Sequence, residues 1–363
     1  MEVPWCLHVI LYMYYSDHAI ILQKKEVQMI TALRVRAITS SRSCISRMSK
    51  RQIDSFFAPS PSKKVKVESL EKSDKVSQHS TYPYAIPHLP AAITDVLGFA
   101  PATEGRVIND QLDLDLLYYQ PYVPKEIEKA LFEFLRQELF FYRVKYKIKR
   151  GPVETDINTP RFTTVFGVDD TSRFAEDGTV VETISKKPVA KDKYKCKPRP
   201  IPQCLDFLRQ ITEGSTGETF NFCLVNYYAS GDDSISYHSD DERFLGVNPS
   251  IASFSLGARR DFLLKHKPIP ASDSAPAPEQ LKPLKYPLAS GDMILMRGKT
   301  QSCWLHSIPK RKGGESEHGR INITFRKGMV KGATENYNQY NVGSGEPYRW
   351  NASKKQMMPW TKD

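Results

Sequence analysis

Strand-like segments between residues 219 and 326 limit the fold of this chain more than any other feature. Each is apolar, and turns rather than helices separate them. The segments read TFNFCLVNYY, SIASFSLGARRDFLLKHK, DMILMRG and RINITFR. Repeated strands without intervening helices predict a β-sandwich or a jelly roll. Residues 271–280 are expected to form a loop inside this fold.

A helix and a basic strand are predicted before this region. Residues 124–142 begin with Pro124 and continue with apolar residues on a helical period, which predicts an amphipathic helix; its apolar positions are Ile127, Leu131, Phe134, Leu135 and Phe141. In the next segment, RVKYKIKR, basic and apolar residues alternate, which predicts a strand with one basic face; the basic positions are Arg143, Lys145, Lys147 and Lys149. Such a face suits a phosphate backbone, although a merely soluble edge strand has the same pattern.

The N-terminal third differs in composition from the rest. Residues 49–101 are rich in Ser, Lys and Pro, so we expect residues 1–104 to be disordered. Within them, KRQIDSFF at 50–57 resembles the peptide that docks on the sliding clamp PCNA, although Lys50 replaces the usual Gln. PSKKVKVE at 61–68 resembles a nuclear-import signal, with a solvated basic run as the alternative. The folded domain is expected over residues 105–332, and the tail 333–363 receives no role.

Composition restricts the compartment and the partners. A net charge of +11 favours an anionic partner such as nucleic acid. No apolar run approaches the length of a membrane span, so no membrane partner is expected, and a monomer is assumed. Six scattered cysteines without a CxxC pair fit a reducing compartment and argue against a cysteine zinc site. Together with the import-like run at 61–68 and the clamp-like motif at 50–57, this predicts a nuclear protein.

The first 47 residues leave a second location open. The stretch RVRAITSSRSCISR is rich in Arg and Ser and lacks acids, which is typical of a mitochondrial transit segment. Alternatively, residues 1–47 are disordered or do not belong to the mature protein, and Met48 is the start.

An acidic stretch at 226–246, NYYASGDDSISYHSDDERFLG, contains a metal-ligand spacing. Residues i and i+2 of a strand share one face, so His238 and Asp240 can converge on one ion. Two histidines and one carboxylate that leave open positions are the arrangement of non-haem Fe(II) oxygenases. A lone HxD is common by chance, and without further support an acidic surface loop is the better explanation. His306, in QSCWLHSIPK after the strand-like DMILMRG, supplies a candidate third ligand.

The segment RINITFR places polar residues on one strand face and apolar residues on the other. The polar face holds Arg320, Asn322, Thr324 and Arg326, whereas Ile321, Ile323 and Phe325 take the opposite face. Two arginines on an inward face would be costly in an ordinary core. They suit a small dianion, because arginine binds carboxylates bidentately.

Taken together, the motifs resemble those of the AlkB family of Fe(II)/2-oxoglutarate nucleic-acid dioxygenases. NYY, HSDDER, SIASFSLGARRDF, WLHSIP and RINITFR occur in the family's order and spacing over roughly residues 105–328. The eukaryotic DNA-repair members are the ones the chain resembles in particular. The resemblance implies a mainly β fold with flanking helices, the double-stranded β-helix (jelly roll), and Fe(II), 2-oxoglutarate and O2 as cofactor and co-substrates.

Roles for individual residues follow from the same resemblance. It implies that His238, Asp240 and His306 hold the iron and carry catalysis. It implies contacts to 2-oxoglutarate from Asn226, Tyr228, Arg320, Thr324 and Arg326, with Arg320 on the distal carboxylate and Arg326 near the metal-binding end. Asp241 matches the position that contacts the target base. Arg161, in the segment TPRFTTVFG, is a further candidate for substrate binding.

The implied activity is oxidative demethylation of N-alkylated bases in DNA, such as 1-methyladenine and 3-methylcytosine. Decarboxylation of 2-oxoglutarate would be coupled to methyl hydroxylation and formaldehyde release. An RNA demethylase is the alternative that the same site permits. A non-enzymatic nucleic-acid-binding module is disfavoured, because all the metal ligands and both arginines are present. A hydroxylase of protein side chains would explain neither the net charge nor Asp241.

Overall fold

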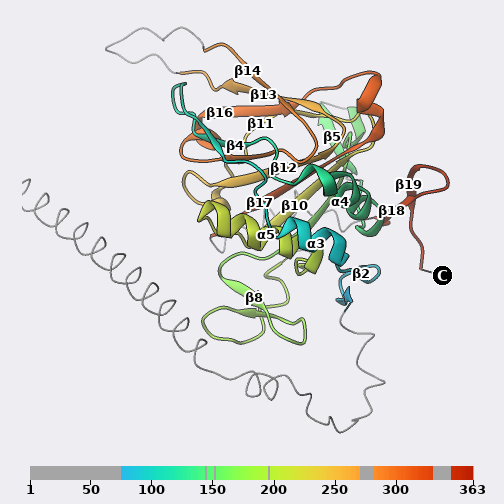
Figure 1. The fold of residues 1–363 in the computed structure, drawn as a ribbon. Helices are drawn as coiled ribbons and strands as arrows, with labels where there is room; N and C mark the ends of the chain where they lie inside the picture. The colour runs from blue at the N-terminus through green and yellow to red at the C-terminus, as the bar shows by residue number, and fades with distance from the viewer. Residues whose placement is uncertain are drawn as a thin grey trace, which may run out of the picture. The chain divides into compact units, whose positions relative to one another are not determined.

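The computed structural model describes residues 75–143, 145–150, 153–194, 197–269, 281–329 and 345–362 (Figure 1). The predictions for the first 47 residues, the clamp-binding-like motif at 50–57, the import-like run at 61–68 and the loop at 271–280 lie outside the described residues. Among the described helices, none combines the length and the apolar character that a bilayer crossing requires.

Two antiparallel sheets form the centre of the described fold. The larger sheet has the strand order β3-β4-β15-β12-β17-β10-β7, and its strands are β3 (Arg106–Ile108), β4 (Leu116–Tyr119), β7 (Phe162–Gly167), β10 (Phe222–Tyr228), β12 (Ile251–Gly257), β15 (Met293–Met296) and β17 (Arg320–Arg326). The smaller sheet has the order β11-β16-β13-β14, and its strands are β11 (Ile235–His238), β13 (Arg260–His266), β14 (Leu284–Leu288) and β16 (Trp304–Ile308). These sheets confirm the predicted jelly roll.

Helices cover the face of the larger sheet that points away from the smaller one (Figure 1). They are α3 (Ala91–Leu97), α4 (Lys125–Glu138) and α5 (Gln203–Thr216). The short α6 (Thr300–Cys303) leads directly into β16, and single 3-10 turns lie at η1 (Arg243–Leu245) and η2 (Gly314–His318). Two-stranded pairs complete the described elements: β1 (Val76–Ser77) with β2 (Ile86–Pro87), β5 (Lys145–Arg150) with β6 (Val153–Asn158), β8 (Ser172–Phe174) with β9 (Val180–Glu182), and β18 (Tyr348–Asn351) with β19 (Gln356–Pro359).

The two-residue period of the strands separates an apolar layer from a polar one. In β17 the side chains of Ile321, Ile323 and Phe325 are fully buried in a cluster with the helices. In β12, Ala252 and Phe254 join the same cluster. The alternate residues of these strands face the space between the sheets, as predicted for RINITFR. Burial of the apolar face therefore directs the polar face toward a common interior site.

The predicted start of the fold near residue 105 was wrong. Ile86, Ile93 and Leu97 are at most 5% exposed and belong to the main core. Ile93 and Leu97 are four residues apart on α3, so they share one helix face against α4. The segment follows a Ser-, Lys- and Pro-rich stretch, and its own prolines interrupt the apolar pattern, which hides the start of the fold in the sequence.

The end of α4 and the tail also differ from expectation. The helix ends at Glu138, and the backbone at Leu139 is extended. Residues 139–142 are all buried, which an extended segment allows because both of its faces are covered. Phe141 bridges to Tyr348, so the tail adds the β18–β19 pair beside α4. Phe132 rather than Phe134 is fully buried on the helix.

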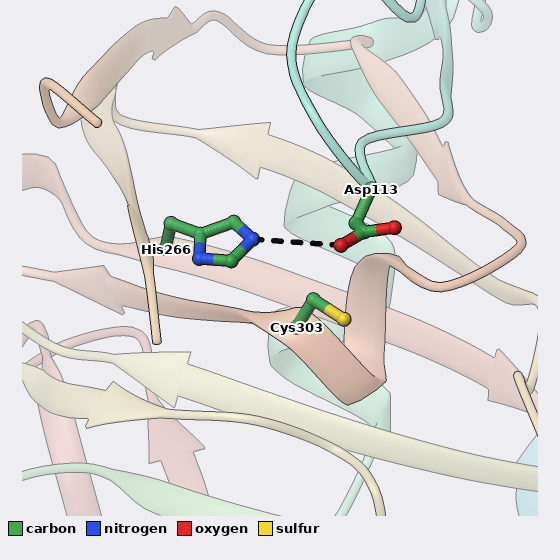
Figure 2. Close-up of side chains that lie close together, drawn as sticks. All are labelled: Asp113, His266 and Cys303. Carbon is green, nitrogen blue, oxygen red and sulfur yellow. Dashed lines mark ion pairs between the residues drawn. The ribbon is translucent and has the colours of Figure 1, made fainter. Parts of the chain in front are cut away.

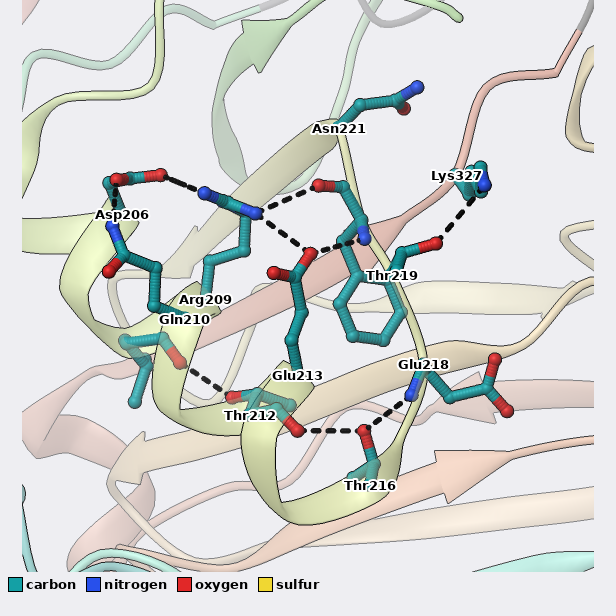
Figure 3. Close-up of polar contacts among 12 residues, drawn as sticks. Asp206, Arg209, Gln210, Thr212, Glu213, Thr216, Glu218, Thr219, Asn221 and Lys327 are labelled. Atoms are coloured by element: carbon teal, nitrogen blue, oxygen red, sulfur yellow. Dashed lines mark hydrogen bonds and ion pairs between the residues drawn. The ribbon is translucent and has the colours of Figure 1, made fainter.

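A polar network joins the end of α5 to the start of β10 (Figure 3). Arg209 forms ion pairs with Asp206 and Glu213, at N–O distances of 2.7 and 2.8 Å. Glu213 also accepts the backbone N–H of Phe220 at 2.6 Å. Gly217 ends the helix with φ of 74°, a conformation that glycine adopts without a steric penalty. This network sets where β10 begins, and β10 carries part of the interior site.

Candidate active site

A cavity of about 90 Å³ lies between the two sheets. One wall comes from β10 and β17 of the larger sheet, and the other from β11 and β16 of the smaller sheet. Most of the predicted site residues line it, namely Arg161, Asn226, Tyr228, His238, Asp240, His306, Arg320, Thr324 and Arg326. The structure therefore brings together residues that are far apart in the sequence.

The three predicted metal ligands converge at one end of this cavity. His238 is the last residue of β11 and lies opposite His306 of β16 in the antiparallel register. Asp240 follows just beyond the end of β11. Its carboxylate oxygens lie 3.7 Å from His238 Nε2 and 3.8 Å from His306 Nε2. The three ligand atoms all lie within 4.8 Å of one another, so one ion can contact all of them.

The protonation of these groups fits a metal site. The Nδ1 atom of His238 donates to the carbonyl of Ser236 at 2.9 Å, which leaves the lone pair on Nε2. Burial, together with His238, lowers the pKa of His306 to about 3, so this ring is neutral at neutral pH. Burial alone would raise the pKa of Asp240, but Arg326 and the two histidines outweigh it and keep the pKa below its usual value. Two imidazoles and one carboxylate are the donor set that suits Fe(II).

Two further side chains hold Asp240 in place. Arg326 Nη2 lies 2.8 Å from Asp240 Oδ2, and both side chains are almost fully buried. The side-chain oxygen of Gln301 accepts the backbone N–H of Asp240 at 3.0 Å. Gln301 was not predicted, because a lone glutamine before the metal-ligand histidine gives no recognisable pattern. Its position in α6 links the helix to the metal ligand.

Arg320 supplies the clearest indication that the cavity can bind an anion. Its side chain is 1% exposed, and Nη2 donates to Ser255 Oγ at 2.7 Å. Its Nε and Nη1 atoms have no hydrogen-bond partner within the described part of the chain. Burial lowers the pKa of Arg320 to about 10, so the guanidinium is still charged at neutral pH. A buried cation with unused donors is unfavourable unless a ligand completes it, and a carboxylate fits the guanidinium fork.

The remaining polar residues of the cavity have protein partners. Asn226 Oδ1 accepts from Arg161 Nε at 3.1 Å, and the Thr324 hydroxyl donates to the carbonyl of Leu224 at 3.1 Å. Asn322 donates to Ser253 Oγ at 2.9 Å. The two serines of β12, 253 and 255, were missed, although their alternation with apolar residues in SIASFSLG is a signal that could have found them.

Asp241 lies outside the cavity lining. Its carboxylate forms an ion pair with Lys267 Nζ at 2.8 Å, and about half of its side chain is exposed. Base contact by Asp241 and substrate binding by Arg161 stay predictions. Another carboxylate of the acidic stretch has a structural role: Asp233 Oδ2 accepts a hydrogen bond from the backbone N–H of Ala229 at 2.7 Å and closes a turn.

Comparison with known proteins identifies the family. A sequence profile of the 2OG-Fe(II) oxygenase superfamily matches residues 115–326. The chain belongs to the 2OG-Fe(II) oxygenase superfamily. Members of this superfamily use Fe(II) and 2-oxoglutarate. The His-Asp-His donor set fits the iron, and the Nε and Nη1 atoms of Arg320, unpaired among the described residues, fit a carboxylate of 2-oxoglutarate.

Named relatives confirm the resemblance to the AlkB family. The chain is 41% identical over 130 residues to "DNA oxidative demethylase ALKBH2" of Homo sapiens, covering 36% of this chain and 48% of that protein. It is 40% identical over 139 residues to the protein of the same name in Arabidopsis thaliana, covering 35% and 43%. It is 41% identical over 119 residues to "Alpha-ketoglutarate-dependent dioxygenase alkB homolog 3" of Rattus norvegicus, covering 33% and 39%. The chain thus spans less than half the length of each of these relatives.

Proposed function

We propose that this chain is a Fe(II)/2-oxoglutarate-dependent dioxygenase that removes N-methyl groups from damaged bases in DNA. The observation that carries the proposal is one interior cavity that holds both a His-Asp-His donor set and an incompletely bonded buried arginine. The first fits the iron, and the second fits a carboxylate of 2-oxoglutarate. A module that only binds nucleic acid would need neither the metal-ligand set nor the buried arginine with unused donors.

DNA is supported as the substrate by the names of the relatives and by the net charge of the chain. Two of the relatives described above are named DNA oxidative demethylases. The net charge of +11 favours a polyanion. The β5–β6 pair contains the basic strand Lys145–Arg150 predicted for phosphate contacts. Because such contacts release counterions, DNA affinity should fall as salt concentration rises.

Each group of residues then has a defined task. Bound iron supplies the oxidation that couples 2-oxoglutarate decarboxylation to hydroxylation of the methyl group. Arg320 orients the co-substrate, while Arg326 and Gln301 keep Asp240 facing the two histidines. His238 is the most exposed ligand, with 32% of its side chain accessible, so the substrate approaches from its side. The target base must leave the stack, and a methyl group on the pairing edge weakens its pairing.

A direct assay tests this proposal. The full chain is incubated with Fe(II), ascorbate, 2-oxoglutarate and an oligonucleotide that carries one 1-methyladenine, and the methyl group is followed by mass spectrometry. We expect demethylation of the DNA strand, with formaldehyde and succinate formed in equal amounts. Demethylation of an RNA strand alone would replace DNA by RNA as the substrate. Turnover of neither strand would overturn the proposal.

Clamp binding and nuclear location stay predictions, because both depend on residues 50–68. The amount of the protein retained on immobilised PCNA should fall when Phe56 and Phe57 are replaced by alanine in the full chain. Equal recovery of the variant and the unmodified chain would remove the support that this motif gives to DNA as the substrate.

A further inference from the structure

A second group of metal-ligand side chains lies outside the cavity (Figure 2). Asp113 comes from the loop between β3 and β4, His266 ends β13, and Cys303 ends α6. A carboxylate oxygen, a ring nitrogen and the Sγ atom all lie within 4.8 Å of one another. None of the three residues lines the interior cavity.

His266 provides an independent sign that this group binds a ligand. It is 5% exposed, and its Nδ1 atom lies 2.6 Å from the carbonyl of Lys267. A carbonyl only accepts, so Nδ1 donates this hydrogen bond, and Nε2 is the ring nitrogen that is left to bind a ligand. Nε2 is buried and has no hydrogen-bond partner within the described part of the chain. It points at Asp113, 3.8 Å from Oδ2, which is too long for a hydrogen bond (Figure 2).

The other two side chains complete a mixed donor set. A hydrogen bond from Lys299 holds the pKa of Asp113 below its usual value, so the carboxylate is ionised. Lys299 contacts Oδ1 at 3.1 Å, which leaves Oδ2 facing His266, and 64% of the lysine side chain is exposed, so it can move aside. Burial and the neighbouring Asp113 raise the pKa of Cys303, so the thiol keeps its proton until a cation displaces it.

We propose that Asp113, His266 and Cys303 form a second metal site that binds Zn²⁺, separate from the catalytic iron. Nitrogen, sulfur and carboxylate oxygen are the donors that zinc accepts, at bond lengths of about 2.0–2.3 Å. In a tetrahedral site these bonds place ligand atoms about 3–4 Å apart, which the 3.8 Å between His266 and Asp113 already satisfies. Water fills the fourth position.

Such a site would brace the strand that carries an iron ligand. Cys303 immediately precedes β16, which contains His306. His266 lies opposite Trp304 in the β13–β16 pair, and the two rings pack edge to face with 5.0 Å between their centroids. A metal held here would tie the β3–β4 loop to both strands. The scattered cysteines argued against a cysteine zinc site, and the proposed site departs from that prediction because it takes a single cysteine together with a histidine and an aspartate.

Cobalt distinguishes the two sites by their donors. Co²⁺ bound to a thiolate absorbs in the near ultraviolet through charge transfer, and the His-Asp-His site contains no thiolate. The full chain carrying His238→Ala, which weakens the iron site, is titrated with CoCl₂ and then with ZnCl₂. We expect a thiolate charge-transfer band that saturates at one equivalent of Co²⁺ and is lost when Zn²⁺ is added.

Matched cysteine variants decide the assignment. Adding Cys303→Ser should remove the band and one zinc equivalent in native mass spectrometry. Adding Cys204→Ala, which removes a buried thiol from the helix-covered core rather than from the proposed ligand set, should retain both. Asp113→Asn, at a partly exposed loop position, should weaken zinc binding in a chain whose circular dichroism is unchanged. Absence of the band, or a band that survives Cys303→Ser, would overturn the proposal.

Discussion

Replacement of His238 by alanine should reduce the proposed demethylation to the background rate, while DNA binding should stay within about twofold of the unmodified chain. The substitution removes one of three ligands from a site whose remaining ligands, Asp240 and His306, are buried. Iron binding needs all three, whereas phosphate contacts depend on basic residues elsewhere. Formaldehyde release and binding of a fluorescent oligonucleotide measure the two effects separately.

His318 offers a matched control for this substitution. It is an exposed histidine in η2, outside the cavity lining, so His318→Ala should retain full activity. Wild-type activity of His238→Ala would contradict the assignment of His238 as an iron ligand. Loss of DNA binding together with the circular-dichroism spectrum would show instead that the substitution unfolds the domain.

Replacement of Arg320 by lysine should raise the KM for 2-oxoglutarate about 10- to 100-fold. Lysine keeps the charge but cannot form two parallel hydrogen bonds to a carboxylate. Loss of one charge-assisted hydrogen bond costs about 1.5–3 kcal/mol, and about 1.4 kcal/mol corresponds to a tenfold change in affinity. Succinate formation at increasing 2-oxoglutarate concentration gives the KM directly.

Arg260 serves as the control because it is equally buried and lies 5.7 Å from the same Tyr228 ring. Its guanidinium donates to backbone carbonyls, including those of Asp233 at 2.8 Å and Pro309 at 2.6 Å. Arg260→Lys should therefore lower stability and leave the KM unchanged. An unchanged KM in Arg320→Lys would show that Arg320 is not the anchor.

The parts of the site that follow strand periodicity could be predicted from the sequence. The alternation in RINITFR placed Arg320 and Arg326 on the interior face, because the apolar residues between them had to enter the core. The spacing of His238 and Asp240 predicted that the two side chains lie close together, which they do, although Asp240 lies just beyond the end of β11 rather than on the strand. Here the local pattern and the tertiary arrangement agree.

Features that depend on packing between distant segments could not be predicted. Gln301 supports Asp240 through a backbone N–H, which leaves no pattern of residue types. Asp113, His266 and Cys303 come from separate elements and share no spacing. Residues 75–104 join the core through apolar side chains, although they follow a stretch whose composition is typical of disorder. In each case the partner, rather than the local sequence, determines the role.

A crystal structure of the full chain grown without O2, with Mn²⁺ in place of Fe²⁺ and with 2-oxoglutarate, tests the central claim most directly. The account predicts one metal ion bound by His238, Asp240 and His306, and one carboxylate of 2-oxoglutarate on the Nε and Nη1 side of Arg320. A metal ion held by other residues, or 2-oxoglutarate bound away from Arg320, would contradict it.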